Sequence, residues 1–163
     1  GDELGIRGPG LYAYFPFESL DRNKKGVIKI GESSDLVRRL DSYHTYFPMG
    51  VTMLAFINNV RTPPGTRATP RKSPKQIRQE MEQYIISHII QNGGRRLYST
   101  TRSRGQNELL EGQTEWVYSS ISQLHEAFSK CAEVYNGTSH LFHLPGKFSV
   151  PKPTYRGSIV FKV

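Results

Sequence analysis

A chain of 163 residues with 36% hydrophobic and 22% charged residues is long enough for one globular domain with a hydrophobic core. No apolar run approaches the roughly 18 residues that a membrane-spanning helix needs, so we expect no association with a membrane. The formal net charge of +8 and the pI of about 9.7 are compatible with nucleic-acid binding, a property that charge alone does not establish.

The N-terminal part of the chain predicts a β-hairpin. Residues 10–17 alternate aromatic and small side chains, which is typical of a strand. Residues 21–26 are polar and end in glycine, which favours a turn, and residues 27–31 favour a returning strand. We therefore expect the two strands to pair in antiparallel fashion.

A short amphipathic helix is expected next. Ser33 or Ser34 can cap it, because a hydroxyl oxygen accepts hydrogen bonds from the free amides of the first helical turn. Leu36, Leu40 and Tyr43 follow at helical spacing. They would give this helix one buried face.

A third strand and a long helix are separated by a segment rich in proline and positive charge. Residues 51–57 predict the strand, and residues 61–75 predict a mobile basic loop. Ser73 and Gln76 have the spacing of a capping box, with proline at the first helical position between them. The helix that they predict should end at residues 92–94, where glycine is abundant.

A second basic and polar segment, residues 95–112, is expected to be another loop. A short strand at residues 114–118 follows, and Ser120 with Gln123 then predicts a capped third helix. Cys131 falls on the apolar stripe of this helix, so we expect it in the core. As the only cysteine, it excludes a disulfide within the chain and disfavours a thiolate zinc site.

Four side chains have the chemistry that phosphodiester hydrolysis requires. The reaction needs a base beside the attacking water, positive charge on the phosphoryl oxygens and stabilisation of the leaving oxygen, usually by a metal. Tyr12 can be the base if a neighbouring cation lowers its pKa from about 10, and Lys29 on the adjacent strand can face the same side. Arg39 and Tyr43 are one helical turn apart and would project together. These residues supply no metal ligand.

The same residues belong to a set of motifs that resembles the GIY-YIG nuclease superfamily. The set consists of Gly10-Leu11-Tyr12, Lys29-Ile30-Gly31, Arg39, Tyr43 and Glu82. The phage and viral branch, which has Lys-Ile-Gly in the second motif, is the closer match. The resemblance covers residues 8–90 and implies a three-stranded antiparallel sheet flanked by helices. It also implies that Gly31 lets the substrate approach the backbone closely.

The resemblance implies a role for each matching side chain. Tyr12 would be the general base, and Lys29 would orient the water or lower the pKa of Tyr12. Arg39 would neutralise the scissile phosphate, and Tyr43 would hydrogen-bond near the water or the phosphate. Glu82 would hold a single Mg²⁺ or Mn²⁺.

Two of these assignments have alternatives within the sequence, and the role of one further acidic residue is open. The long tip of the predicted hairpin makes Tyr14 a rival to Tyr12 as the base. Glu80 is the alternative to Glu82 as the metal ligand. Glu115 is either a second acidic ligand or, in the interpretation that we favour, a structural partner.

The expected organisation is one α+β nuclease domain at residues 1–135 and an irregular C-terminal extension at residues 136–163. The two basic loops, 61–75 and 95–112, flank the helix that carries the glutamate and are expected to contact DNA. The expected DNA-binding side chains are Arg67, Arg71, Lys72, Lys75, Arg95, Arg96, Arg102 and Arg104.

The sequence therefore predicts a phage- or virus-type endonuclease that uses Mg²⁺ or Mn²⁺ to hydrolyse double-stranded or branched DNA. Such a protein would act inside cells, wherever DNA is, in the nucleus or the cytoplasm. Cutting both strands with one site per chain would need two copies or two visits, which leaves a homodimer open. The alternative is a catalytically inactive GIY-YIG-like module that binds nucleic acid or a protein partner.

Overall fold

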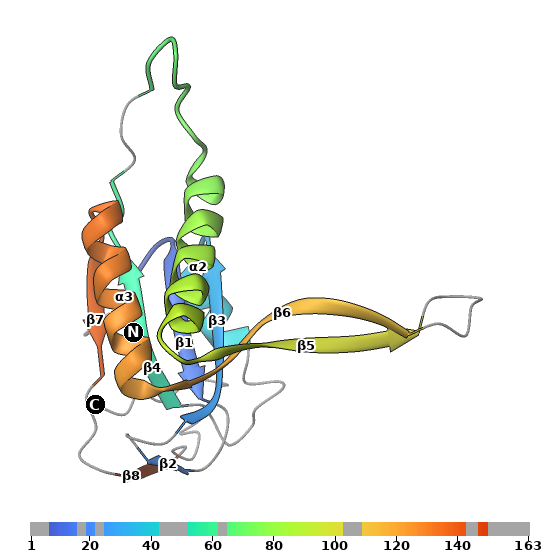
Figure 1. The fold of residues 1–163 in the computed structure, drawn as a ribbon. Helices are drawn as coiled ribbons and strands as arrows, with labels where there is room; N and C mark the ends of the chain where they lie inside the picture. The colour runs from blue at the N-terminus through green and yellow to red at the C-terminus, as the bar shows by residue number, and fades with distance from the viewer. Residues whose placement is uncertain are drawn as a thin grey trace.

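A computed structural model gives the fold of the chain and describes residues 7–15, 19–21, 25–42, 52–61, 65–102, 109–142 and 147–149. Its main element is a six-stranded sheet in which every pair of neighbours is antiparallel, with the strand order β5-β6-β3-β1-β4-β7 (Figure 1). The strands of this sheet are β1 (Gly10–Phe15), β3 (Lys25–Ser33), β4 (Thr52–Asn58), β5 (Arg95–Arg102), β6 (Leu109–Ser120) and β7 (Thr138–Leu141).

Three helices and a small second sheet complete the described structure. The helices are α1 (Leu36–Ser42), α2 (Pro74–Gln91) and α3 (Ile121–Tyr135). The second sheet pairs β2 (Ser19–Asp21) with β8 (Lys147–Ser149). Within the described residues, none of these helices combines the length and the apolar character needed to cross a membrane.

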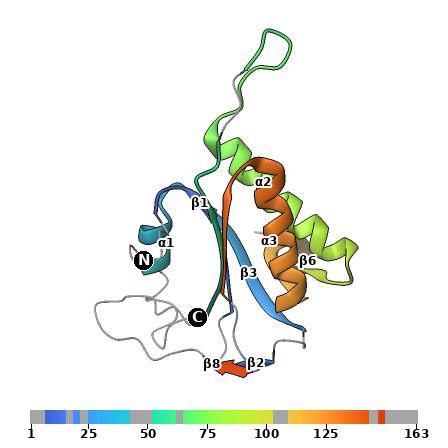
Figure 2. The same cartoon turned by 90° about the vertical axis from the view of Figure 1, so that its left-hand side faces the viewer.

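The helices cover both faces of the main sheet (Figure 2). Helices α2 and α3 lie on one face, where Ile28 and Ile30 of β3 and Leu54 of β4 join the larger buried cluster. Helix α1 lies on the other face and contributes Leu36 and Leu40 to a smaller cluster. The rest of that cluster consists of Tyr12, Tyr14, Met53, Phe56 and Phe142. Successive side chains along β1 and β3 thus contribute to two separate hydrophobic cores, one on each face of the sheet.

The predicted α+β class is confirmed, but the predicted three-stranded sheet is wrong in its number of strands. The three expected strands form the centre, in the order β3-β1-β4. Strands β6 and β5 extend the sheet on one side, and β7 extends it on the other. β3 and β4 each pair with β1 along one edge, which leaves backbone amide and carbonyl groups along the other edge. Further strands can form hydrogen bonds with these groups.

Two segments that were expected to be irregular contain strands. Residues 95–112 are not a loop, because β5 pairs with β6 from Arg95 opposite Tyr118 to Arg102 opposite Leu109. Residues 136–163 include β7, which pairs with β4. The polar composition of both segments gave no strand pattern in the sequence. An edge strand or a projecting ribbon buries few apolar side chains and so does not need such a pattern.

The two long helices begin where the sequence predicts. Ser73 and Gln76 form a complete capping box at α2, and Ser120 and Gln123 form another at α3. The start of α1 differs from the prediction, because the Asp35 carboxylate accepts a hydrogen bond from the Arg38 amide. Aspartate is as good a cap as serine, and its negative charge also suits the positive end of the helix dipole.

Candidate active site

The candidate site lies where strand β6 leaves β3. The two strands pair from Lys25 opposite Ser120 to Lys29 opposite Trp116, while β1 pairs with β3 as far as Ser33. Beyond Lys29, β6 continues with β5 as a two-stranded arm that projects from the core (Figure 1). Among the described strands, none pairs with the next residues of β3 on that side. The open edge lets side chains from both faces of the sheet meet.

A cavity of about 230 Å³ occupies this edge and gathers residues from β1, β3, α1, α2 and β6. Its lining residues are Tyr12, Lys29, Ile30, Gly31, Glu32, Arg39, Gln79, Glu82 and Glu115. Four of the five side chains predicted to be catalytic therefore share one cavity, namely Tyr12, Lys29, Arg39 and Glu82. The fifth, Tyr43, lies outside the described residues.

Tyr12 owes its place in the cavity to the glycine opposite it. Tyr12 and Gly31 are cross-strand partners, and a Cβ atom added to Gly31 would lie 2.3 Å from both Cζ and the hydroxyl oxygen of Tyr12. The tyrosine ring therefore lies over the glycine backbone. Tyr14, the alternative base, is not among the lining residues and packs edge-on against Trp116 at 6.0 Å.

Lys29 is held at the site by two contacts. Its Nζ atom lies 3.1 Å from Oε2 of Glu115 and 5.7 Å from the centre of the Trp116 ring. Burial alone would raise the pKa of Glu115, but the hydrogen bond and the positive charge of Lys29 outweigh burial and lower it. Glu115 therefore pairs with Lys29 and also lines the cavity.

Glu82 projects from α2 into a setting that disfavours its negative charge. It is only 8% exposed, and burial raises its pKa to about 7. The negative charges of Glu115 and Glu32 push the pKa in the same direction, while Lys29 and Arg96 oppose them. Glu80, the alternative, forms an ion pair with Lys72 on the exposed side of the same helix and is not a lining residue.

Glu32 and Gln79 also line the cavity, although neither was predicted to belong to the site. Nε of Arg78 lies 2.9 Å from Oε2 of Glu32, so this acidic group also has a cationic partner. Two signals in the sequence pointed to them. Glu32 directly follows the motif glycine on the same strand, and Gln79 precedes Glu82 by three residues, which places both on one helix face.

The acidic side chains at the cavity do not form a multidentate metal cage. Within the described residues, no group of three or more histidine, cysteine, aspartate or glutamate side chains is placed to hold one ion. The cavity does combine three carboxylates with two cations, Lys29 and Arg39. Only Glu82 among the carboxylates is buried, since Glu32 and Glu115 keep 20% and 48% of their side chains exposed.

The predicted DNA-binding residues fall into two groups near the two ends of α2. Arg67, Arg71, Lys72 and Lys75 are exposed ahead of the helix or at its start. After the helix, Arg95 packs over the Tyr118 ring at 5.2 Å, and Nη1 of Arg96 donates to Gln83 at 3.2 Å. Arg102 belongs to β5, although its side chain is outside the described part of the structure, and Arg104 lies entirely outside it.

The chain was compared with protein-family models, with curated proteins and with solved structures, and none of the three comparisons found a match. The motifs and the geometry of the cavity are therefore the features that bear on function.

Proposed function

We propose that this protein is a metal-dependent endonuclease that hydrolyses DNA phosphodiester bonds. One observation carries the proposal: a single cavity contains Tyr12, Lys29, Arg39 and Glu82, which come from four different elements. Packing alone gives no reason for a tyrosine, two cations and a buried glutamate to converge at an open sheet edge. The resemblance to GIY-YIG nucleases predicts this set.

Each side chain has a distinct task in the proposed reaction. The Tyr12 hydroxyl takes a proton from the attacking water, and the positive charge of Lys29 favours the phenolate form that this requires. Arg39 stabilises the negative charge that builds up on the phosphoryl oxygens. Gly31 leaves the space in which the hydroxyl and the substrate approach each other.

The surroundings of Glu82 suit a divalent cation. A buried carboxylate near two others gains from a nearby positive charge, because the cation relieves both the desolvation and the repulsion that raise the pKa. Mg²⁺ is commonly held by one or two carboxylates together with substrate phosphates, so a three-ligand cage is not required. Glu82 would hold the ion, which would supply charge stabilisation at the departing oxygen.

The two groups of cations give DNA a path across the site. They lie near opposite ends of α2, and a helix of 18 residues is about 27 Å long at 1.5 Å per residue. Duplex DNA rises about 3.4 Å per base pair, so the span corresponds to roughly eight base pairs. The arm of β5 and β6 begins beside the cavity, where the charges of Arg96 and Glu115 act on Glu82. The major groove of DNA is wide enough to admit a two-stranded ribbon of this kind.

Removal of one hydroxyl group tests the proposal. We expect wild-type protein to nick supercoiled plasmid in Mg²⁺ or Mn²⁺ but not in EDTA, and we expect Tyr12→Phe to lower the rate by about 10²- to 10⁴-fold, the usual contribution of a general base. The phenyl ring keeps the packing against Gly31, so thermal unfolding should change little. Gel-based nicking rates and differential scanning fluorimetry measure the two quantities.

Tyr14→Phe is the matched control, because it removes the same group from the neighbouring buried tyrosine on the same face of β1. It should keep the cleavage rate within a few-fold of wild type. If Tyr14→Phe abolished cleavage and Tyr12→Phe did not, the base would be misassigned. DNA binding without cleavage in any metal would favour the inactive binding module.

Metal binding should depend on pH through Glu82. With a pKa of about 7, this carboxyl is mostly protonated at pH 6 and mostly ionised at pH 8. Because Mg²⁺ competes with the proton, its affinity should rise by about tenfold between pH 6 and pH 8. Isothermal titration calorimetry of the DNA-free protein measures this change. An affinity independent of pH would contradict the role given to Glu82.

A further inference from the structure

The outward face of α2 is formed by neutral polar side chains. Gln76, Gln79, Gln83 and Ser87 follow one another at helical spacing, and all four are exposed. Exposed helix faces carry charged or polar side chains, and on this face they are polar and neutral. Neutral amides instead offer both donors and acceptors, and they neither attract nor repel a polyanion strongly.

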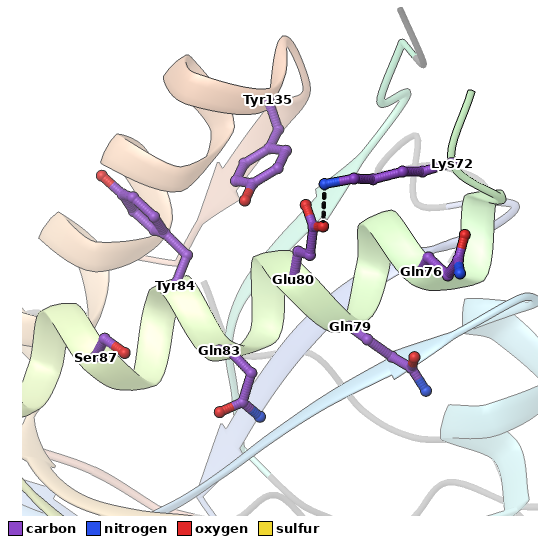
Figure 3. A pocket seen from close by; sticks show the side chains of 8 residues that line it. All are labelled: Lys72, Gln76, Gln79, Glu80, Gln83, Tyr84, Ser87 and Tyr135. Atoms are coloured by element: carbon purple, nitrogen blue, oxygen red, sulfur yellow. Dashed lines mark hydrogen bonds and ion pairs between the residues drawn. The ribbon is translucent and has the colours of Figure 1, made fainter. Parts of the chain in front are cut away.

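This face forms the floor of a shallow groove of about 660 Å³ (Figure 3). Half-buried Tyr84 and Tyr135 rise along one side, with ring centres 6.1 Å apart in an edge-to-face arrangement. Lys72 reaches into the groove near the start of the helix and pairs with Glu80 (Figure 3). The groove therefore combines amides, aromatic rings and a cation.

The groove and the candidate active site have one lining residue in common. Gln79 lines both the groove and the cavity that contains Tyr12 and Glu82. Near the start of the helix, the groove also shares Lys72, Glu80 and Tyr135 with a recess of about 310 Å³ that Arg61 and Arg71 line as well. A ligand that lies along α2 in the groove can thus approach both the cavity and a cluster of positive charge at the start of the helix.

Lys72 can exchange its carboxylate partner, Glu80, for a phosphate group. The side chains of Lys72 and Glu80 are 54% and 41% exposed, and exposed ion pairs contribute little to stability. A phosphate oxygen competes with a carboxylate for the same ammonium group, so Lys72 can turn to a nucleic-acid backbone at small cost.

We propose that this groove binds a single-stranded segment of the nucleic acid whose backbone is cut in the cavity. The proposal rests on the proposed nuclease function and names its substrate class, a strand that is unpaired beside the cleavage point. Unpaired bases can stack on Tyr84 and Tyr135 and can hydrogen-bond to the amides, whereas the bases of a duplex already stack on each other. From Gln76 to Ser87 the helix rises about 16 Å, the length of roughly five stacked nucleotides.

Added negative charge in the groove tests this proposal without altering the cavity. The double variant Gln76→Glu/Ser87→Glu places two carboxylates on exposed positions that do not line the cavity, and glutamate preserves the capping box at the first position. The matched control is Ser122→Glu/Ser129→Glu, which adds the same charge on exposed positions of α3 outside the groove. Fluorescence anisotropy in EDTA measures binding of labelled oligothymidylate and of a hairpin duplex at one salt concentration.

We expect the groove variant to bind oligothymidylate at least tenfold more weakly than the control variant, with duplex binding equal in the two proteins. Tyr84→Leu, which keeps an apolar side chain against the core, should weaken oligothymidylate binding by about tenfold through loss of stacking. Three results would overturn the inference. The groove and control variants could bind oligothymidylate with equal affinity, the wild-type protein could show no measurable oligothymidylate binding, or the groove variant could lose affinity equally for oligothymidylate and for the duplex.

Plasmid nicking by the same proteins separates this inference from the proposed function. If wild-type protein nicks plasmid but the groove variants bind oligothymidylate normally, the nuclease stands and the single-strand groove is wrong. If no protein nicks plasmid but the groove variants alone lose oligothymidylate binding, the groove stands as a binding site and the nuclease assignment is wrong.

Discussion

Glu82→Gln is expected to lower the rate of metal-dependent cleavage by about 10³-fold or more. The amide keeps the size of the side chain but is a much weaker ligand for Mg²⁺, and loss of about 4 kcal/mol of charge stabilisation corresponds to this factor. DNA binding should persist, because removal of a buried negative charge from the cavity does not weaken its attraction for phosphate. Nicking rates and anisotropy measure the two effects.

The same substitution should stabilise the folded protein at high pH in the absence of metal. The pKa of Glu82 is raised from an ordinary value of 4.5 to about 7, so the folded state binds this proton more tightly than the unfolded state does. The free energy of unfolding of the wild-type protein therefore falls as pH rises from about 4.5 to 7. Above pH 7 this loss of stability is complete. Glutamine cannot ionise, so we expect the variant to gain on the order of 2 kcal/mol in free energy of unfolding at pH 8 and little at pH 4.

A control on another helix isolates these effects. Glu126→Gln makes the same chemical change at an exposed position of α3 outside the cavity, and it should alter neither cleavage nor the pH dependence of unfolding. Mg²⁺ should raise the melting temperature of wild-type protein at pH 8 but not that of Glu82→Gln. If Glu82→Gln cut DNA at the wild-type rate, Glu82 would be excluded as the metal ligand.

The central part of the fold was predictable because its sequence is locally consistent. The hydrophobic strands, the capping boxes at Ser73 and Ser120 and the helical stripes all point to the same elements. Cys131 is fully buried as predicted, and burial raises the pKa of its thiol to about 12, which makes it unreactive. These features depend on neighbours in the sequence or on a periodic pattern.

The outer strands were not predictable in the same way. In β5, polar residues such as Arg95 and Arg96 give no strand pattern that would predict the pairing with β6. That pairing depends on backbone hydrogen bonds and on partners distant in the sequence. The separation of β6 from β3 on the N-terminal side of Trp116 also leaves no mark in the sequence, although it creates the open edge where the cavity forms. Secondary-structure patterns do not encode such a divergence.

The members of the candidate site were predicted mainly through motif order. Hairpin geometry brings Tyr12 beside Gly31, which follows from antiparallel pairing. No local rule brings Glu82 of α2 to the same cavity, and no local rule predicts that Glu32 and Glu115 raise its pKa. Those relations arise from the packing of α2 across the sheet edge.

Gly31→Ala is expected to abolish most of the proposed activity without unfolding the protein. The new methyl group would lie 2.3 Å from Cζ and from the hydroxyl oxygen of Tyr12, closer than real Cβ contacts allow. The ring cannot move freely, because it is 1% exposed and lies parallel to Tyr14, with ring centres 6.2 Å apart. Overpacking of this kind costs about 1–3 kcal/mol. A displacement of about 1 Å at the proposed base can lower a rate by about 10²-fold.

Gly10→Ala separates a loss of activity from a loss of stability. A Cβ atom at Gly10 would lie 2.0 Å from the carbonyl oxygen of Ile57, a backbone atom held in β4, and Gly10 does not line the cavity. We expect this variant to be less stable than Gly31→Ala, because a strand backbone yields less readily than a ring. Per folded molecule, however, it should cut DNA at nearly the wild-type rate. Melting temperatures and nicking rates corrected for the folded fraction test both statements.

The contrast between the two alanine variants bears directly on Tyr12. If Gly31→Ala is folded and inactive while Gly10→Ala is unstable but active, the position of the Tyr12 hydroxyl matters to the reaction and not merely to the core. If folded Gly31→Ala cuts DNA as fast as wild type, a ring displaced by the methyl group does not impair the reaction. Tyr12 would then be a packing residue, and another group at the cavity would have to act as the base.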